Sequence, residues 1–146
     1  MAIVSEATLA DRSELLRLLG EQMREHHIDI TPERLAAGVD SGLRGEHGRF
    51  LVARVDERVA GVAYYSFAWP LEAGGLVVWL EELYVDPPFR DRGTGNQLVD
   101  AVIAIARAAG ALAVDLEVEE SQRRVESLYD RHGFRPHTRR HWTLVL

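Results

Sequence analysis

The feature that most constrains the fold is the apolar run at residues 76–85, "LVVWLEELYV", which leads into a glycine-rich turn. A nearly continuous apolar run is typical of a central strand buried on both faces. Residues 94–109 then carry apolar side chains at helical spacing, and residues 111–118 alternate like a further strand. A strand–helix–strand unit pairs its strands in parallel, whereas a hairpin pairs them antiparallel. Because a predicted hairpin precedes this unit, we expect one mixed sheet.

The remaining segments supply more strands and helices. Thr31 and Pro32 form a typical helix start, and the first helix carries Leu15, Leu16, Leu19 and Met23 on one stripe. In chain order we expect a strand at 2–7, two helices, a hairpin of strands 50–55 and 59–69, the unit described above, a short helix at 121–133 and a pair of short strands within 134–146. The predicted fold class is α/β, a single domain over residues 1–146. Its mixed, mostly antiparallel sheet has about six to seven strands with helices on both faces.

Composition excludes several classes of protein. The 146 residues include no cysteine, which removes disulfides, a zinc ribbon and a cysteine nucleophile. The formal charge of −6 argues against nucleic acid as a partner. Neither a signal peptide nor a membrane-length apolar run is present, so we expect a cytoplasmic protein without a membrane partner. The histidines do not form a metal-binding pattern, and no metal is predicted.

The turn "RDRGTGNQ", residues 90–97, lies between a predicted strand and a helix. Glycines there let backbone N–H groups approach an anion, and the helix N-terminus adds partial positive charge. The alternative is that Gly93 and Gly95 only form a tight turn. The dinucleotide fingerprint fails because Leu98 stands where its third glycine should be, and the Gly-Lys-Ser/Thr triplet of the Walker loop does not occur.

Arg90-x-x-Gly93-x-Gly95 resembles the first signature of the GCN5-related N-acetyltransferases. "SLYDRHGF", residues 127–134, is similar to that family's second signature, and the predicted element order agrees over nearly the whole chain. "WLEELYV" is most similar to the diamine and thialysine acetyltransferase branch, although that match is short.

The resemblance implies acetyl-coenzyme A as the acetyl donor, splayed central strands, and a homodimer, which is common in the family. It also implies that Leu83, Tyr84 and Val85 pair with the pantetheine arm. Gln122 stands where the family often has an asparagine that contacts pantetheine, so this contact is in doubt. The residues implied to hold the pyrophosphate are Arg90, Asp91, Arg92, Gly93, Thr94, Gly95 and Asn96.

Acetyl transfer to an amine requires a proton acceptor, because a free alkyl amine is mostly protonated near neutral pH. Glu81 and Glu82 are the candidates, and strict strand alternation would direct them to opposite faces. The branch resemblance favours the first acid, Glu81. The family resemblance implies that Tyr129 is the general acid for the thiolate, whereas the residues alone favour a packed helical side chain.

The expected function is therefore direct transfer of acetyl from acetyl-coenzyme A to a primary amine of a small molecule, polyamine-like or amino-acid-like. The alternatives are acetylation of a protein N-terminus or lysine, and a non-catalytic acetyl-coenzyme A-binding module.

Overall fold

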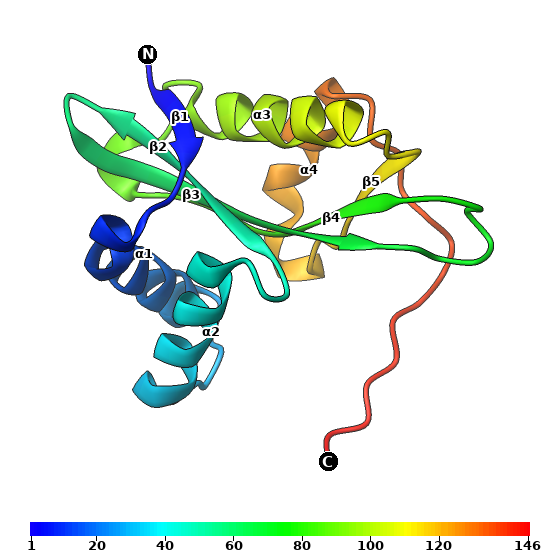
Figure 1. The fold of residues 1–146 in the computed structure, drawn as a ribbon, viewed down its shortest axis with the longest axis horizontal. Coiled ribbons are helices and arrows are strands. Elements are labelled where there is room, and N and C mark those ends of the chain that lie inside the picture. Colours follow the sequence, from blue (N-terminus) through cyan, green and yellow to red (C-terminus); the bar gives the residue numbers. More distant parts are fainter.

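The computed structural model describes all residues, 1–146, and contains one five-stranded sheet in the order β1-β2-β3-β4-β5 (Figure 1). The first three pairings are antiparallel and the pairing of β4 with β5 is parallel. The elements are β1 (Ile3–Glu6), α1 (Arg12–Glu25), α2 (Pro32–Arg44), β2 (Arg49–Val55), β3 (Arg58–Ala68), β4 (Val77–Val85), α3 (Thr94–Ala108), β5 (Ala113–Leu116) and α4 (Glu126–Arg131). Short 3-10 turns lie at Leu9–Asp11, Pro87–Phe89 and Glu120–Val125.

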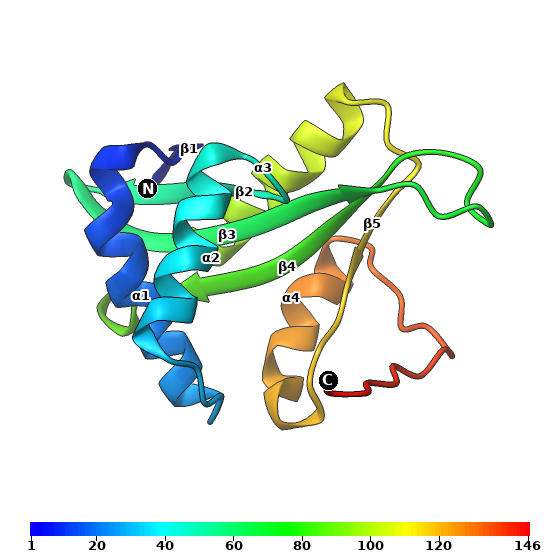
Figure 2. The ribbon, with the colours of Figure 1, turned by 60° about the horizontal axis from the view of Figure 1, so that its bottom comes forward.

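Helices cover both faces of the sheet, as predicted (Figures 1 and 2). On one face α3 buries Leu98, Val99 and Val102 against β4 and its neighbours. On the other face α1 and α2 bury Leu15 and Val39 and their neighbours against β2 and β3. Full burial of such a side chain stabilises the fold by about 1.5–3 kcal/mol, so two apolar layers hold the sheet between them.

Local signals in the sequence set several element boundaries correctly. The Thr31 side chain accepts a hydrogen bond from the Arg34 amide at 3.2 Å, and Pro32 opens α2. Asp56 and Glu57 both have positive φ, at 47° and 67°, which is the pattern of a two-residue hairpin turn between β2 and β3. The predicted hairpin is therefore confirmed.

The predicted pair of C-terminal strands is absent, and the sheet has five strands instead of six to seven. Figure 2 shows the tail leaving α4 as an unpaired segment. β5 is only four residues long and offers a short free edge on which to build a ladder. In the tail Arg139 forms an exposed ion pair with Glu72, and the His141 ring lies within hydrogen-bond distance of Glu117.

The strands β4 and β5 diverge, as the family resemblance implied. Their pairing ends at Leu80 with Leu116, whereas β4 continues to Val85. The Asp86 amide donates to Ala60 of β3, so strand alternation turns the peptide groups of Val85 and Leu83 toward the open side. Backbone groups on this open edge are available to an extended ligand. None of the helices is both long enough and apolar enough to cross a membrane.

Candidate active site

A β-bulge at Glu81 shapes the middle of β4. Tyr64 of β3 pairs with Glu82, whereas Tyr65 pairs with Leu80, so Glu81 is the extra residue. The bulge reverses the alternation along the strand. Leu80 packs against the α3 layer, but Glu82 lies on the opposite side, where Tyr84 packs against α1. A bulge of this kind re-aims side chains, often beside an active site.

Glu82 is half-buried against α1. Its Oε2 accepts a hydrogen bond from Nε2 of Gln22 at 2.9 Å, and Gln22 is only 2% exposed. Burial raises the pKa of Glu82 above 4.5, the hydrogen bond from Gln22 opposes this, and the negative charges of Glu81 and Glu119 add to the increase. The raised pKa makes Glu82 a stronger base than an ordinary exposed carboxylate.

Glu81 lies in a different environment. It is exposed, and its Oε1 accepts a hydrogen bond from Ser66 at 2.9 Å. Burial is the main cause of the raised pKa of Tyr64, and the negative charge of Glu81 raises it further. The charge of Glu81 also raises the pKa of Glu82. The expectation of opposite faces is therefore wrong. Because of the bulge both acids act on the same side of the sheet, with Glu82 the more enclosed of the two.

Tyr129 lies in α4, beside the open edge of β4. Its ring contacts the α3 layer and meets the Phe134 ring edge-on, with 5.7 Å between centroids. Burial, followed by the negative charge of Glu82, raises the pKa of the Tyr129 hydroxyl to about 12. The phenol therefore keeps its proton at neutral pH. The Tyr129 hydroxyl therefore lies within electrostatic reach of Glu82.

The glycine-rich loop presents a row of free amides. No backbone N–H group from Asp91 to Asn96 has an acceptor within the protein. Asp91 and Gly93 have positive φ, at 60° and 83°, and an added Cβ at Gly93 would meet nothing within 4 Å. The loop opens α3, so the helix dipole adds to these donors. This geometry fits the pyrophosphate of coenzyme A, and Arg92, exposed beside it, supplies a cation.

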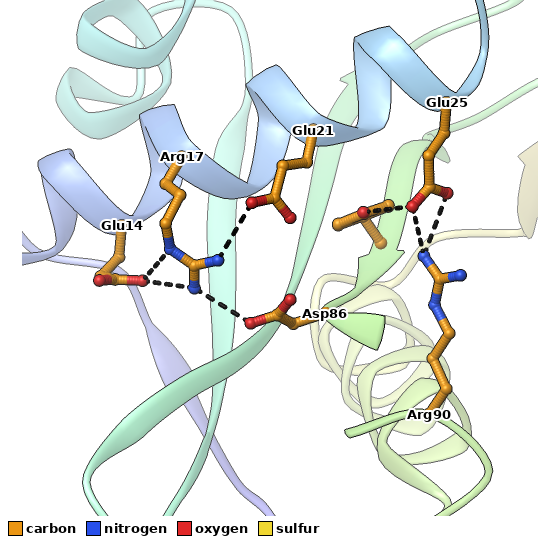
Figure 3. A network of polar contacts seen from close by, with 7 residues as sticks. Glu14, Arg17, Glu21, Glu25, Asp86 and Arg90 are labelled. Atoms are coloured by element: carbon orange, nitrogen blue, oxygen red, sulfur yellow. Dashed lines mark hydrogen bonds and ion pairs between the residues drawn. The ribbon is translucent and has the colours of Figure 1, made fainter. Parts of the chain in front are cut away.

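The Arg90 side chain makes hydrogen bonds to two other parts of the protein. Its Nε donates to the Val85 carbonyl at 2.9 Å, and its Nη2 contacts both Glu25 oxygens at 3.0 and 3.1 Å (Figure 3). The Tyr84 hydroxyl donates to Glu25 Oε1 at 2.7 Å. Burial opposes ionisation of Glu25, but the bonds from Tyr84 and Arg90 outweigh it and lower the pKa of Glu25. These contacts fix the end of α1 against the end of β4.

A second ionic contact joins the same two elements. Arg17 of α1 donates to the buried Asp86 at 3.1 Å and also pairs with Glu14 and Glu21 (Figure 3). Asp86 directly follows β4 and precedes the glycine-rich loop. Together with Arg90, this contact sets the position of the loop relative to α1.

An apolar slot of about 150 Å³ opens between α1, α2 and the sheet. Seven of its ten lining residues are hydrophobic, among them Leu19 and Met23 of α1 and Leu35 of α2. Its two charged lining residues are Glu82 and Arg34. Glu82 thus lines the slot, and its negative charge also acts on the Tyr129 hydroxyl.

The structure brings Glu81, Glu82, Tyr129, the glycine-rich loop and the open edge of β4 to one end of the splayed strands. Gln122 is half-buried in the 3-10 turn before α4 and has non-helical backbone angles. Its side chain makes no hydrogen bond within the protein. Gln22 was missed from the sequence. The signal was present, because a glutamine stands seven residues after Leu15 on the buried stripe of α1.

The chain belongs to the acetyltransferase (GNAT) family, whose model matches residues 12–134. It is 30% identical over 117 residues to an uncharacterized N-acetyltransferase of Mycobacterium bovis, covering 73% of this chain and 70% of that protein. It is 27% identical over 140 residues to a thialysine N-epsilon-acetyltransferase of Mus musculus, covering 86% and 79%. A mycothiol acetyltransferase of Propionibacterium freudenreichii subsp. shermanii is 46% identical over 52 residues, which cover 36% of this chain and only 17% of that enzyme.

Solved structures confirm the fold. A transcriptional regulator from Bacillus halodurans superposes with a TM-score of 0.87 at 18% identity, covering 100% of both chains. An aminoglycoside N-acetyltransferase in complex with CoA superposes with a TM-score of 0.84 at 19% identity, covering 99% of this chain and 95% of that one. The splayed mixed sheet is therefore the acetyltransferase fold that the two sequence signatures implied.

Proposed function

We propose that this chain transfers acetyl from acetyl-coenzyme A directly to a primary amine of a small molecule, with Glu82 as general base and Tyr129 as general acid. The observation that carries the proposal is the position of Glu82. It borders the apolar slot and is an electrostatic neighbour of the Tyr129 hydroxyl. An amine nitrogen held at Glu82 would face a thioester lying along the open edge of β4.

Coenzyme A fits the residues at this edge. The free amides from Asp91 to Asn96 would hold the pyrophosphate. The peptide groups of Leu83 and the amide of Val85, whose carbonyl already accepts from Arg90, would pair with the pantetheine arm. The Arg90 side chain positions this edge through Val85 and Glu25. The contact of Gln122 with the pantetheine arm is proposed from the family resemblance. Acetyl-coenzyme A supplies the activated thioester.

The proton steps follow from the two side chains. Glu82 accepts a proton from the ammonium, and the neutral nitrogen attacks the thioester carbonyl. The attacking nitrogen then carries one proton more than an amide keeps. As the carbon–sulfur bond breaks, Tyr129 donates its proton to the departing thiolate and regains one from that nitrogen, and the proton held by Glu82 passes to solvent, so that one proton is released per turnover. A raised pKa suits Glu82 to the first role, because a base works best when its pKa lies close to the working pH. A phenol with a pKa of about 12 remains protonated for the second role.

Two measurements test the proposal. Titration calorimetry should show binding of coenzyme A, and a thiol-release assay with a panel of amines should show acetyl-dependent turnover. Absence of coenzyme A binding would contradict the proposal at its first step. Binding without thiol release from any amine would favour a non-catalytic acetyl-coenzyme A-binding module, and release only with peptides would favour a protein acetyltransferase.

The proposed assembly is a homodimer. Trp142, Leu144 and Val145 are at least 83% exposed in the tail, and the outer edge of β5 has no partner. Exposed strand edges and clustered apolar side chains are typical of surfaces that another chain covers.

A further inference from the structure

We infer that the acceptor is amino-acid-like and not polyamine-like: one amine on a short apolar body, with an anionic group at its far end that meets Arg34. This inference rests on the proposed function, in which the reacting nitrogen lies at Glu82. It adds the chemical class of the acceptor, which the family and the sequence leave open between two types.

The walls of the slot determine what can lie beyond the reacting nitrogen. α1 contributes Leu19 and Met23, α2 contributes Leu35 and Gly38, and the Phe50 ring lines the sheet side. The Tyr64 hydroxyl is the one further polar group of the lining, and apart from Glu82 the lining holds no carboxylate that could neutralise a second ammonium along the body of the substrate. Placing an uncompensated charge among them carries a desolvation penalty, whereas methylene groups gain from burial.

The size of the slot limits the length of the body. Its volume is about 150 Å³. Since one water molecule requires only about 10–15 Å³ of such space, the slot has room for the short chain of a small molecule. The two charged residues that line the slot are Glu82 and Arg34, and the inferred body of the acceptor lies between them.

Arg34 is the residue that distinguishes the two acceptor types. It lies in the first turn of α2 and is exposed, and it makes no ion pair within the protein. Its hydrogen bond to Thr31 uses the backbone amide, so the guanidinium is free. A second ammonium at this end would meet a cation, whereas a carboxylate would meet a partner that can bind it bidentately.

The acids around Glu82 act on the reacting end of the acceptor. Glu81 and Glu119 both raise the pKa of Glu82, so their charges reach it, but neither lines the slot. Gln22 adds a buried Oε1 without a hydrogen-bond partner beside Glu82. An ammonium has several N–H donors for such groups. Recognition of positive charge is therefore concentrated at one end of the slot.

Three amines that differ only at the far end test the inference: 5-aminopentanoate, pentylamine and 1,5-diaminopentane. Thiol release should give the highest kcat/KM with 5-aminopentanoate, an intermediate value with pentylamine, and a value about tenfold lower with the diamine, since like charges disfavour a partner. Arg34→Glu should invert the order of the two charged substrates. Arg24→Glu makes the same charge change on the exposed surface of α1, outside the slot, and should preserve the order.

A narrowing variant tests where the body lies. An added Cβ at Gly38 would meet nothing within 4 Å, so Gly38→Leu extends into the slot without disturbing the helix. It should lower kcat/KM several-fold more for pentylamine than for methylamine, since methylamine does not fill the slot.

The possible failures are distinguishable. If wild-type protein binds acetyl-coenzyme A but acetylates none of the amines, the proposed function falls, and this inference falls with it. If turnover occurs but is equal across the three five-carbon amines, or fastest with the diamine, acetyl transfer stands and the assignment of the slot is overturned. An unchanged order in Arg34→Glu overturns the role of Arg34.

Discussion

At the scale of single residues, the site depends on which carboxylate receives the proton. Glu82→Gln should lower kcat by about 10²–10⁴-fold, the usual contribution of a general base. Glu81→Gln removes a charge one position away and should retain most of the activity, because Glu81 is exposed and bonded to Ser66. Thiol release at saturating acetyl-coenzyme A checks this pair. The reverse ranking would restore Glu81, which the sequence favoured.

Glu82→Gln should also make the protein more stable at neutral pH. Burial raises the pKa of Glu82 in the folded chain above its value in the unfolded chain, so the folded state loses stability as pH rises through the folded pKa. Glutamine keeps an oxygen acceptor for Gln22 and carries no charge. Glu82→Gln should therefore have a melting temperature close to wild type at low pH and a higher one at neutral pH. Calorimetry at both pH values measures the difference, and an equal or lower melting temperature at neutral pH would contradict the cost assigned to the charge.

Gln22 is a positioning residue that acts through Glu82. Its Nε2–H stabilises the ionised carboxylate and so opposes the rise in the pKa of Glu82. Gln22→Leu removes that donor, so the pKa of Glu82 should increase. Since the base acts when ionised, the acidic limb of the kcat/KM profile should move to higher pH.

The control for Gln22→Leu is Gln97→Leu, which breaks hydrogen bonds of a side-chain amide with the Ala2 backbone away from Glu82. A merely structural role for Gln22 predicts that both variants lose stability and keep the wild-type limb. Displacement of the limb in Gln22→Leu alone supports its role through Glu82.

At the scale of elements, α2 carries two glycines that should respond oppositely to alanine. An added Cβ at Gly38 meets nothing within 4 Å, whereas at Gly42 it would lie 2.2 Å from Cε2 of Phe50. Gly38→Ala should raise the free energy of unfolding by about 1 kcal/mol through helix propensity. Gly42→Ala should lower it by about 1–3 kcal/mol, since the Phe50 ring must move. Urea unfolding of the two variants provides the comparison, and equal effects would contradict the packing of α2 on β2.

The sequence predicted most elements because their signals are local. Thr31 and Pro32 start α2, and the apolar periodicity of residues 94–109 predicts α3. The relation between Glu81 and Glu82 was not predictable in this way, because the bulge exists only in the register of β4 on β3. The predicted C-terminal strands failed for a similar reason. A strand pattern needs a partner edge, and the free edge of β5 is four residues long.

At the scale of the whole molecule, the site forms where three separate parts of the chain meet. The Arg90 guanidinium joins α1, β4 and the glycine-rich loop through Glu25 and the Val85 carbonyl. The two signatures place Arg90 in the loop, but its partner lies 65 positions earlier in the sequence. A contact between residues so far apart in sequence cannot be predicted from a local motif. The sequence alone therefore could not show that the Arg90 side chain positions the loop.

The exposed apolar side chains of the C-terminal tail are the proposed interface of the homodimer. Burial of one large apolar side chain contributes about 1.5–3 kcal/mol, and 1.4 kcal/mol corresponds to tenfold in affinity. If a second copy covers the tail, the double variant Trp142→Ser, Leu144→Ser should dissociate the dimer. The control is Leu9→Ser, Leu71→Ser, which removes two leucines that are 74% and 92% exposed outside the tail. Light scattering across a concentration series should show a dimer for wild type and control and a monomer for the tail variant. A wild-type monomer at every concentration would contradict the dimer, and a tail variant that remains dimeric would place the interface elsewhere.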